Sequence, residues 1–366
     1  MKKYKVSIIG AGNGGRAFAS YLAQRGHEVR LGFRTFRNIR KIFLTHKIIS
    51  DGEIEGIFAL DSVSNDYSRI IKNSDVILIV VPASAHSSII KHITPFLTDN
   101  QVILLNPGRT WGAVEAYNII RRRRPYLRIF VGETQTLLFT CRKRDDYGVS
   151  VLRVKDEVKC CFYPEYNNNY MRPVIGTLFP QLSIVDDIRV TSLNNIGAMV
   201  HPATVLLNSG AICRKQCFNF YRNGVNEQLG RVLEQIDAER CAIMEALHVD
   251  GLSYLEWAKE VYGVSATSMC EAFRMIDSYK TIGAPKNLRK RYLTEDVPTG
   301  LVPLQSIAHY LNIPTPTIDA VVHLVDTILG TNYATNGRTI ENVNLPLRLI
   351  DTIDEILLPE TFLETI

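Results

Sequence analysis

The first third of the chain alternates short apolar runs with segments of helical period. Residues 5–9 form an apolar run that breaks into a glycine turn, and residues 28–33 alternate apolar and polar side chains as a half-buried strand does. Residues 75–81 are continuously apolar, which is typical of a parallel strand buried on both faces. Further strands are expected at residues 102–105, 127–131, 149–152 and 158–162. Over residues 4–135 this alternation predicts an α/β fold with a doubly wound, mainly parallel sheet.

From about Thr191 the pattern changes to long segments of helical period. One apolar face has this period and consists of Leu229, Val232, Leu233, Ile236, Ile243, Met244 and Leu247. The charged residues Asp237, Glu239 and Arg240 fall mostly off that face. Two prolines interrupt the pattern ahead of another apolar helix at residues 318–329. The second half therefore predicts an all-α domain that closes over the carboxyl edge of the sheet.

The turn after the first strand carries glycines at the spacing of a dinucleotide-binding motif. Gly10 suits a tight turn, Gly12 admits a pyrophosphate, and Gly15 allows close packing of helix on strand. The helix expected from near Asn13 directs its free N–H groups at the phosphates. We therefore expect a cofactor site formed by Gly10, Gly12, Asn13, Gly14 and Gly15. The alternative is a bare structural turn.

Other turns follow the carboxyl ends of expected strands, where open α/β sheets bind ligands. Pro82 ends the strand at residues 75–81, and the chain leads through His86 into the next helix. Residues 106–110 and 132–134 form two further turns of this kind. We expect Pro82 to lie against the cofactor.

The residue at the end of the second strand normally decides which nicotinamide cofactor binds. An NAD site places Asp or Glu there, about 20 residues past the glycines, to hold the ribose hydroxyls. This chain has Arg34, with Arg37 one helical turn on, and no carboxylate between Val29 and Ser50. A guanidinium fork suits a 2′-phosphate. The sequence therefore favours NADP(H), with NAD(H) as the second choice, unless these arginines belong to a basic solvated helix.

Length and charge bound the remaining possibilities. With 366 residues the chain exceeds what one hydrophobic core usually supports. We expect a dinucleotide-binding Rossmann domain at residues 1–187 and a helical substrate-binding and catalytic domain at residues 188–366. The net charge of +5 is mild. The basic run at residues 121–124 is interpreted as a solvated helix end, so no nucleic-acid partner is expected.

Hydropathy and cysteine content bear on the cellular compartment and on metal binding. No apolar stretch reaches membrane-spanning length, and the first strand begins without a preceding signal-peptide segment. We therefore expect a cytoplasmic protein with no membrane partner. The seven cysteines include no paired Cys-x-x-Cys clusters, so we expect free, reduced thiols and no metal site.

Two places in the second half carry chemically active side chains. His201 lies in a small, mainly apolar setting near an expected helix start, where a histidine is more often a satisfied core residue than a catalyst. Within residues 291–301, one cation, Arg291, and two carboxylates, Glu295 and Asp296, fall inside six residues just before a proline. Taken alone, this stretch could equally be a charged loop.

Together these pieces resemble the opine dehydrogenase family, which includes the octopine and nopaline dehydrogenases and their bacterial relatives. The resemblance covers nearly the whole chain. The matching segments are the glycine turn, residues 81–83 with His86, residues 106–108, 112–115 and 133–134, His201-Pro202, Asp237 with Glu239-Arg240, and residues 291–298, 300–303 and 337–339. The Arg-Tyr-Leu-x-Glu-Asp-Val-Pro stretch at residues 291–298 is the most specific of these.

The resemblance implies an N-terminal Rossmann domain, a helical C-terminal domain, and reductive condensation of a 2-oxo acid with an amino acid. It also implies that His201 and Asp296 are the catalytic pair and that Arg291 anchors a substrate carboxylate. Arg34 is a departure, because several familiar members prefer NADH and carry an acidic residue at that strand end.

The chemistry of such a reaction agrees with these residues. A secondary amine forms from a 2-oxo acid and an amine through an imine, whose carbon accepts hydride while protons move at oxygen and nitrogen. Histidine titrates near neutrality and can both accept and donate those protons. A carboxylate on its other ring nitrogen, here Asp296, would fix the tautomer and stabilise the imidazolium. Arg291 can hold a carboxylate through two parallel hydrogen bonds, whereas Glu295 is expected to point elsewhere.

Two other functions fit the same plan. A hydroxyacid or sugar-phosphate dehydrogenase would reduce a carbonyl without an amine, and a cofactor-sensing module would bind NADP(H) without chemistry. The amino acid and the 2-oxo acid are not specified, because the pocket residues lie on helices whose packing the sequence does not fix. The oligomeric state is equally open, with a homodimer as one expectation.

Overall fold

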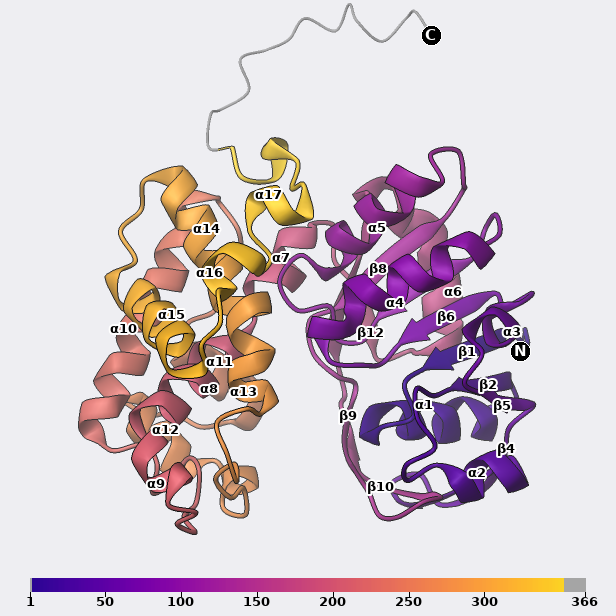
Figure 1. Ribbon diagram of the computed structural model, residues 1–366, viewed down its shortest axis with the longest axis horizontal. Coiled ribbons are helices and arrows are strands. Elements are labelled where there is room, and N and C mark those ends of the chain that lie inside the picture. The colour runs from indigo at the N-terminus through magenta and orange to yellow at the C-terminus, as the bar shows by residue number, and fades with distance from the viewer. Residues whose placement is uncertain (1, 352–366) are drawn as a thin grey trace, which may run out of the picture.

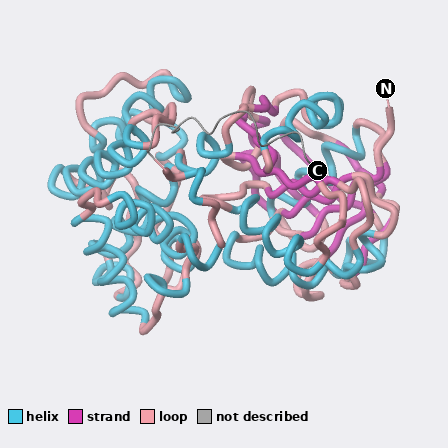
Figure 2. Tube along the Cα trace, turned by 90° about the horizontal axis from the view of Figure 1, so that it is seen from above, coloured by secondary structure: helices cyan, strands magenta, loops and turns pink. Residues whose placement is uncertain are grey.

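The computed structural model describes residues 2–351, which form two lobes side by side (Figure 1). The strands are gathered in one lobe and the other is helical (Figure 2). This arrangement confirms the predicted fold class, a Rossmann-like α/β domain followed by an all-α domain.

The main sheet has eight strands in the order β12-β11-β8-β7-β6-β1-β2-β5. Neighbouring strands are parallel except for β8 and β11, which run antiparallel. The strands are β1 (Lys5–Ile9), β2 (Glu28–Gly32), β5 (Ser62–Ser64), β6 (Val76–Ile79), β7 (Val102–Leu105), β8 (Phe130–Thr134), β11 (Val158–Tyr163) and β12 (Leu182–Ile184). Because β1 pairs with β2 on one side and with β6 on the other, the strand order reverses at β1. That reversal is where open α/β sheets bind nucleotides.

Helices cover both faces of this sheet. They are α1 (Asn13–Gln24), α3 (Tyr67–Ile71), α4 (His86–Ile93), α5 (Gly112–Arg123) and α6 (Asn168–Leu178). Helix α1 begins at Asn13, as the glycine pattern predicts. The arginine run forms the last turn of α5, where positive charge is favourable at a helix end.

A second, four-stranded sheet was not predicted. It has the order β4-β3-β10-β9 and packs against α1, where Phe18 meets Phe139 edge to face at 4.7 Å between ring centroids. Its strands are β3 (Lys47–Gly52), β4 (Gly56–Ala59), β9 (Phe139–Lys143) and β10 (Gly148–Val154), with α2 (Arg40–Thr45) just before β3. The strand expected at residues 149–152 belongs to this sheet.

One strand prediction has the wrong boundaries. The segment expected at residues 127–131 becomes a strand only at Phe130 and continues through Thr134. Leu127 instead closes a turn after α5, because its N–H donates to the carbonyl of Arg124 at 3.2 Å. Glu133 therefore lies within the strand and not in the turn beyond it.

The helical domain is organised around α10 (Glu227–Ala246), whose first turn is capped by the Asn226 side chain. Its other helices are α7 (Ile188–Leu193), α8 (Ile196–Leu207), α9 (Ser209–Cys213), α11 (Tyr254–Tyr262), α12 (Met269–Met275), α13 (Arg291–Thr294), α14 (Val302–Leu311), α15 (Pro316–Leu329), α16 (Tyr333–Asn336) and α17 (Ile340–Val343). A π-helical turn at Val297–Leu301 connects α13 to α14.

Burial on α10 extends beyond the predicted apolar face. Asp237, Glu239 and Arg240 are all buried. Arg240 donates to Asp237 Oδ1 at 2.6 and 3.0 Å, and the two carboxylate oxygens of Glu239 accept the first N–H groups of α15. Each of these buried charges has hydrogen-bond or ion-pair partners, and these partners make its burial tolerable. The apolar pattern alone does not reveal that this part of α10 is buried.

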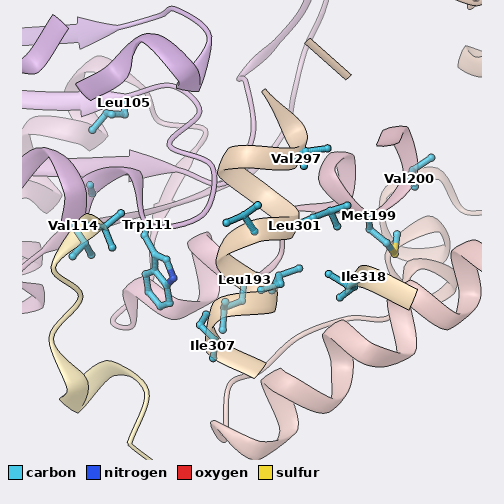
Figure 3. Packing of buried hydrophobic residues seen from close by; sticks show 14 of the residues in the cluster. Leu105, Trp111, Val114, Leu193, Met199, Val200, Val297, Leu301, Ile307 and Ile318 are labelled. Carbon is cyan, nitrogen blue, oxygen red and sulfur yellow. The ribbon is translucent and has the colours of Figure 1, made fainter. Parts of the chain in front are cut away.

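The two domains share one buried hydrophobic cluster (Figure 3). Leu105 ends β7, Trp111 precedes α5 and Val114 lies in its first turn, while Leu301 and Ile307 come from the helical domain. This packing brings the carboxyl edge of the sheet against the π-helical turn. No helix within residues 2–351 is long and apolar enough to cross a membrane.

Candidate active site

The glycine turn has the geometry that each of its glycines predicts. Gly10 has φ of +121°, and a Cβ there would lie 2.2 Å from the carbonyl oxygen of Val80. A Cβ on Gly15 would lie 1.6 Å from the carbonyl oxygen of Gly10, so helix and strand pack too closely for a side chain. A Cβ on Gly12 would meet nothing within 4 Å. The turn is therefore tightly packed on the protein side and open at Gly12, which fits a bound pyrophosphate.

The residues beside this turn lie at the same edge of the sheet. Asn13 starts α1, and its Oδ1 accepts the N–H of Lys143 at 3.1 Å, so the second sheet holds the helix start. Gly14 faces Val80, whose Cγ1 would lie 2.9 Å from an added Cβ. Pro82 follows β6 and is exposed. The structure thus gathers every residue expected at the phosphates.

Arg34 and Arg37 lie on the loop between β2 and α2, and both are exposed. Within the described part of the chain neither side chain has a hydrogen-bond or ion-pair partner. The loop itself is held by the buried Arg16 of α1, which donates to the carbonyls of Asn38 and, at 3.1 Å, of Ala11. Arg16 therefore connects the glycine turn to the arginine loop, a role that no motif in the sequence predicts.

In the helical domain, His201 of α8 contacts Asp296, which directly precedes the π-helical turn. The His201 Nδ1 to Asp296 Oδ2 distance is 2.7 Å, and Asp296 is 1% exposed. Burial by itself would raise the pKa of Asp296, but the charges of Arg109 and His201 outweigh it and hold that pKa below its usual value. The carboxylate is therefore ionised and accepts the Nδ1 proton.

Two tyrosines complete the surroundings of the His201 ring. The Tyr221 hydroxyl lies 3.0 Å from Nε2, and the Tyr292 ring stacks on the imidazole at 4.3 Å between centroids. Since Nδ1 carries the proton of neutral His201, Nε2 accepts a hydrogen bond from Tyr221. Burial raises the pKa of Tyr221 well above its usual value, so this hydroxyl keeps its proton.

A guanidinium from the sheet domain reaches this pair. Arg109 follows β7, and its Nη2 lies 3.2 Å from Asp296 Oδ1. Its Nη1 donates to Asn195 Oδ1 at 2.9 Å, and its Nε lies 3.4 Å from Glu295 Oε1. The expectation that Glu295 points elsewhere is wrong, because both adjacent carboxylates turn toward Arg109. Desolvation would lower the pKa of Arg109, but Asp296 and Glu295 raise it instead.

Arg291 is exposed at the start of α13, and its side chain has no hydrogen-bond or ion-pair partner among residues 2–351. It lines a cavity of about 390 Å³ together with Gly283, Pro285, Lys290 and Tyr292. Tyr292 lines this cavity and also stacks on the imidazole of His201, and the charge of Arg291 acts on Asp296. The structure therefore brings Arg291, His201 and Asp296 into one neighbourhood, as the sequence predicts.

Several buried polar atoms near the carboxyl edge of the sheet lack partners in the described residues. Both amide atoms of Asn106 are unpaired at the end of β7, as are Thr134 Oγ1 at the end of β8 and Asn195 Nδ2 beside Arg109. Buried polar groups in native proteins are nearly always hydrogen-bonded. This set therefore suits a polar ligand lying between the glycine turn and His201. Among the described residues, no group of three or more His, Cys, Asp or Glu side chains is placed to hold a metal ion.

Three residues of the site were not identified from the sequence, namely Arg109, Tyr221 and Tyr292. Arg109 gave the clearest signal, because it is a cation in a turn already expected at the ligand-binding edge. Tyr292 lies inside the specific stretch at residues 291–298. Tyr221 sits in a loop without any motif and could be found only in three dimensions.

Comparisons with known proteins agree with this geometry. Residues 184–329 match the family model of the NAD/NADP octopine/nopaline dehydrogenase alpha-helical domain, and residues 5–107 match that of the NAD-dependent glycerol-3-phosphate dehydrogenase N-terminus. An opine dehydrogenase of Arthrobacter sp. (strain 1C) is 37% identical over 340 residues, covering 93% of this chain and 94% of that protein. A vitopine synthase of Allorhizobium ampelinum is 27% identical and covers 96% of this chain and 99% of that protein.

Solved structures share the fold at lower identity. Octopine dehydrogenase with NADH and L-arginine has a TM-score of 0.76 at 19% identity, covering 95% of this chain and 96% of that one. Yersinopine dehydrogenase with NADP⁺ bound has a TM-score of 0.72 at 13% identity, covering 93% and 97%. The resemblance in the sequence motifs is confirmed by the similarity to the Arthrobacter protein along nearly the whole of both chains, and this chain belongs to the opine dehydrogenase family.

Proposed function

We propose that the protein condenses an amino acid with a 2-oxo acid and reduces the resulting imine with NADPH or NADH. Family membership supports the reaction type. The observation that carries the proposal is the His201–Asp296 pair, 2.7 Å apart, which Tyr292 connects to a cavity lined by the Arg291 side chain. A proton-transfer group and a carboxylate anchor are what this condensation requires at one place.

His201 is the general acid and base in this proposal. The amino acid must lose a proton to attack the carbonyl, and the hydroxyl that results must gain one to leave as water. His201 Nε2 accepts the first proton and returns the second through the Tyr221 hydroxyl, its hydrogen-bond partner, while Asp296 stabilises the intervening imidazolium through Nδ1. The nicotinamide, when bound, supplies the hydride that reduces the imine carbon. Tyr221 and Tyr292 hold the ring in place from its edge and its face.

Arg291 binds a substrate carboxylate in this proposal, since both substrates carry one and a guanidinium fork matches it. The same cavity contains a second cation, Lys290, and no carboxylate. An amino acid with a cationic side chain would meet two positive charges there. We therefore propose an amino donor whose side chain is neutral or acidic.

The cofactor is proposed to be NADP(H) in preference to NAD(H). The glycine turn would hold the pyrophosphate, with Gly12 facing it and the start of α1 directing N–H groups toward it. Arg34 and Arg37 would bind the 2′-phosphate, since neither is engaged elsewhere in the described structure. The domain boundary is proposed between residues 187 and 188, at the start of α7, so that residues 1–187 bind the cofactor and residues 188–366 carry His201, Arg291 and Asp296.

The test is the rate of NADPH consumption with a 2-oxo acid, measured with and without a panel of amino acids. We expect consumption only when both substrates are present. Equal consumption without any amine would establish carbonyl reduction of the hydroxyacid type instead. Binding of NADPH without turnover on any pair, unchanged by His201→Asn, would establish a sensing module.

A further inference from the structure

Arg109 is placed to connect the sheet domain to the catalytic pair. It lies in the loop between β7 and α5, and its three side-chain partners, Asn195, Glu295 and Asp296, all belong to the helical domain. Its side chain is 14% exposed, and those of Glu295 and Asp296 are 5% and 1% exposed. At this depth the charges are weakly screened by solvent, so each one affects its neighbours strongly.

The four charged groups form a chain in which each contacts the next. Glu295 contacts Arg109, Arg109 contacts Asp296 Oδ1, and Asp296 Oδ2 contacts His201 Nδ1. Apart from Asp296, the groups of the described residues that contact the His201 ring are uncharged, namely the Tyr221 hydroxyl and the rings of Phe220 and Tyr292. Arg291 acts on the same carboxylate as a further positive charge.

We propose that Arg109, with Glu295 as its counter-charge, is a positioning residue that sets how strongly Asp296 holds a proton on His201. This inference rests on the proposed role of His201 as general acid and base. Arg109 and the His201 imidazolium compete for one carboxylate, so the guanidinium makes His201 release its proton more readily. Glu295 offsets part of the Arg109 charge and acts in the opposite direction. The proton affinity of His201 is thus set partly by a residue of the domain that binds the cofactor.

Replacing Arg109 and replacing Glu295 should therefore move the titration midpoint of His201 in opposite directions. Arg109→Gln removes the competitor for Asp296, so the imidazolium becomes more stable and His201 should titrate about one pH unit higher. Glu295→Gln leaves Arg109 without its counter-charge, so His201 should titrate about half a unit lower. Arg109→Lys keeps the charge and should leave the midpoint near that of the wild type. It should lower kcat, because lysine cannot hold Asn195, Glu295 and Asp296 at once.

The experiment follows the titration of His201 by NMR on full-length protein labelled at histidine Cε1, with its signal identified by its absence in His201→Asn. Arg69→Gln, an exposed arginine on α3, is the matched control and should shift nothing. Shifts of opposite sign in Arg109→Gln and Glu295→Gln support the proposal. Shifts of the same sign, or no shifts, overturn it. A purely structural contact would give the two variants no reason to shift the midpoint in opposite directions.

A second readout separates this proposal from the proposed function. The pH dependence of kcat/KM should move with the NMR midpoints if His201 is the acid and base. Near-normal turnover in His201→Asn would end the catalytic role of His201, while the NMR midpoints would still decide the charge coupling. If Arg109→Gln fails to fold, Glu295→Gln decides alone, because it replaces a single oxygen and its midpoint must fall.

Discussion

The surroundings of His201 and the proposed cofactor site are built differently. At the catalytic end, Asp296 is buried, His201 and Arg109 are half-buried, and the three are joined by short contacts. At the cofactor end, Arg34 and Arg37 are exposed and stand on a loop. Burial and prior hydrogen bonding fix the first set before any ligand arrives, whereas the second set must be ordered by the ligand. Substitutions at the catalytic end should therefore act strongly on turnover, and those at the cofactor end should act moderately on binding and depend on salt.

The largest effect is expected at the imidazole. His201→Asn should lower kcat by about 10²–10⁴, the usual scale of general acid–base catalysis, with little change in cofactor affinity. His323→Asn, a change at an exposed histidine of α15, is the control and should be silent. Steady-state kinetics and NADPH titration measure both quantities. A variant that turns over near the wild-type rate would place the acid and base elsewhere.

The next effect concerns the exposed arginines. Well-formed charge-assisted hydrogen bonds contribute roughly 1.5–3 kcal/mol each, and exposure reduces this, so we expect about a tenfold to thousandfold preference for NADPH. Arg34→Asp should bring NADH level or ahead, while Arg40→Asp on α2 should not. The Michaelis constants of both cofactors decide the matter, and a wild-type preference for NADH would mean that these arginines only face solvent.

A smaller effect is expected at the substrate anchor. Arg291→Lys keeps the charge but loses the planar fork, so the Michaelis constant of one acid substrate should rise about tenfold. The kcat at saturation should change less, since His201 and Asp296 are untouched. Unchanged Michaelis constants for both the amino acid and the 2-oxo acid would show that another group binds the carboxylate.

The smallest effect is expected at Lys290, because it is exposed and solvent screens its charge. Lys290→Glu should improve kcat/KM for arginine relative to glutamate by about twofold to tenfold, as expected of exposed charges worth about 0.2–1 kcal/mol each. Lys286→Glu on the same loop does not line the cavity and serves as the control. An equal change in both variants would show a general effect of surface charge.

The same contrast explains what the sequence could reveal. The glycine turn and the stretch at residues 291–298 are local patterns, so their positions and chemistry could be read directly. The contact of Arg109 with Asp296 joins two domains, and no local spacing encodes it. The burial of the α10 charges was not predicted for the same reason, since several of their partners come from α11 and α15. The second sheet was missed because its strands come from separate parts of the chain and pair over α1.

We propose that His201 and Asp296 serve the reduction of an imine and not of a carbonyl. The most direct test of this proposal is the mass of the product formed from a 2-oxo acid, a ¹⁵N-labelled neutral amino acid and NADPH. Imine reduction predicts a secondary amine that keeps the ¹⁵N and contains both carbon skeletons, with one product formed for each NADPH consumed. A product that contains only the reduced 2-oxo acid and no nitrogen would contradict it.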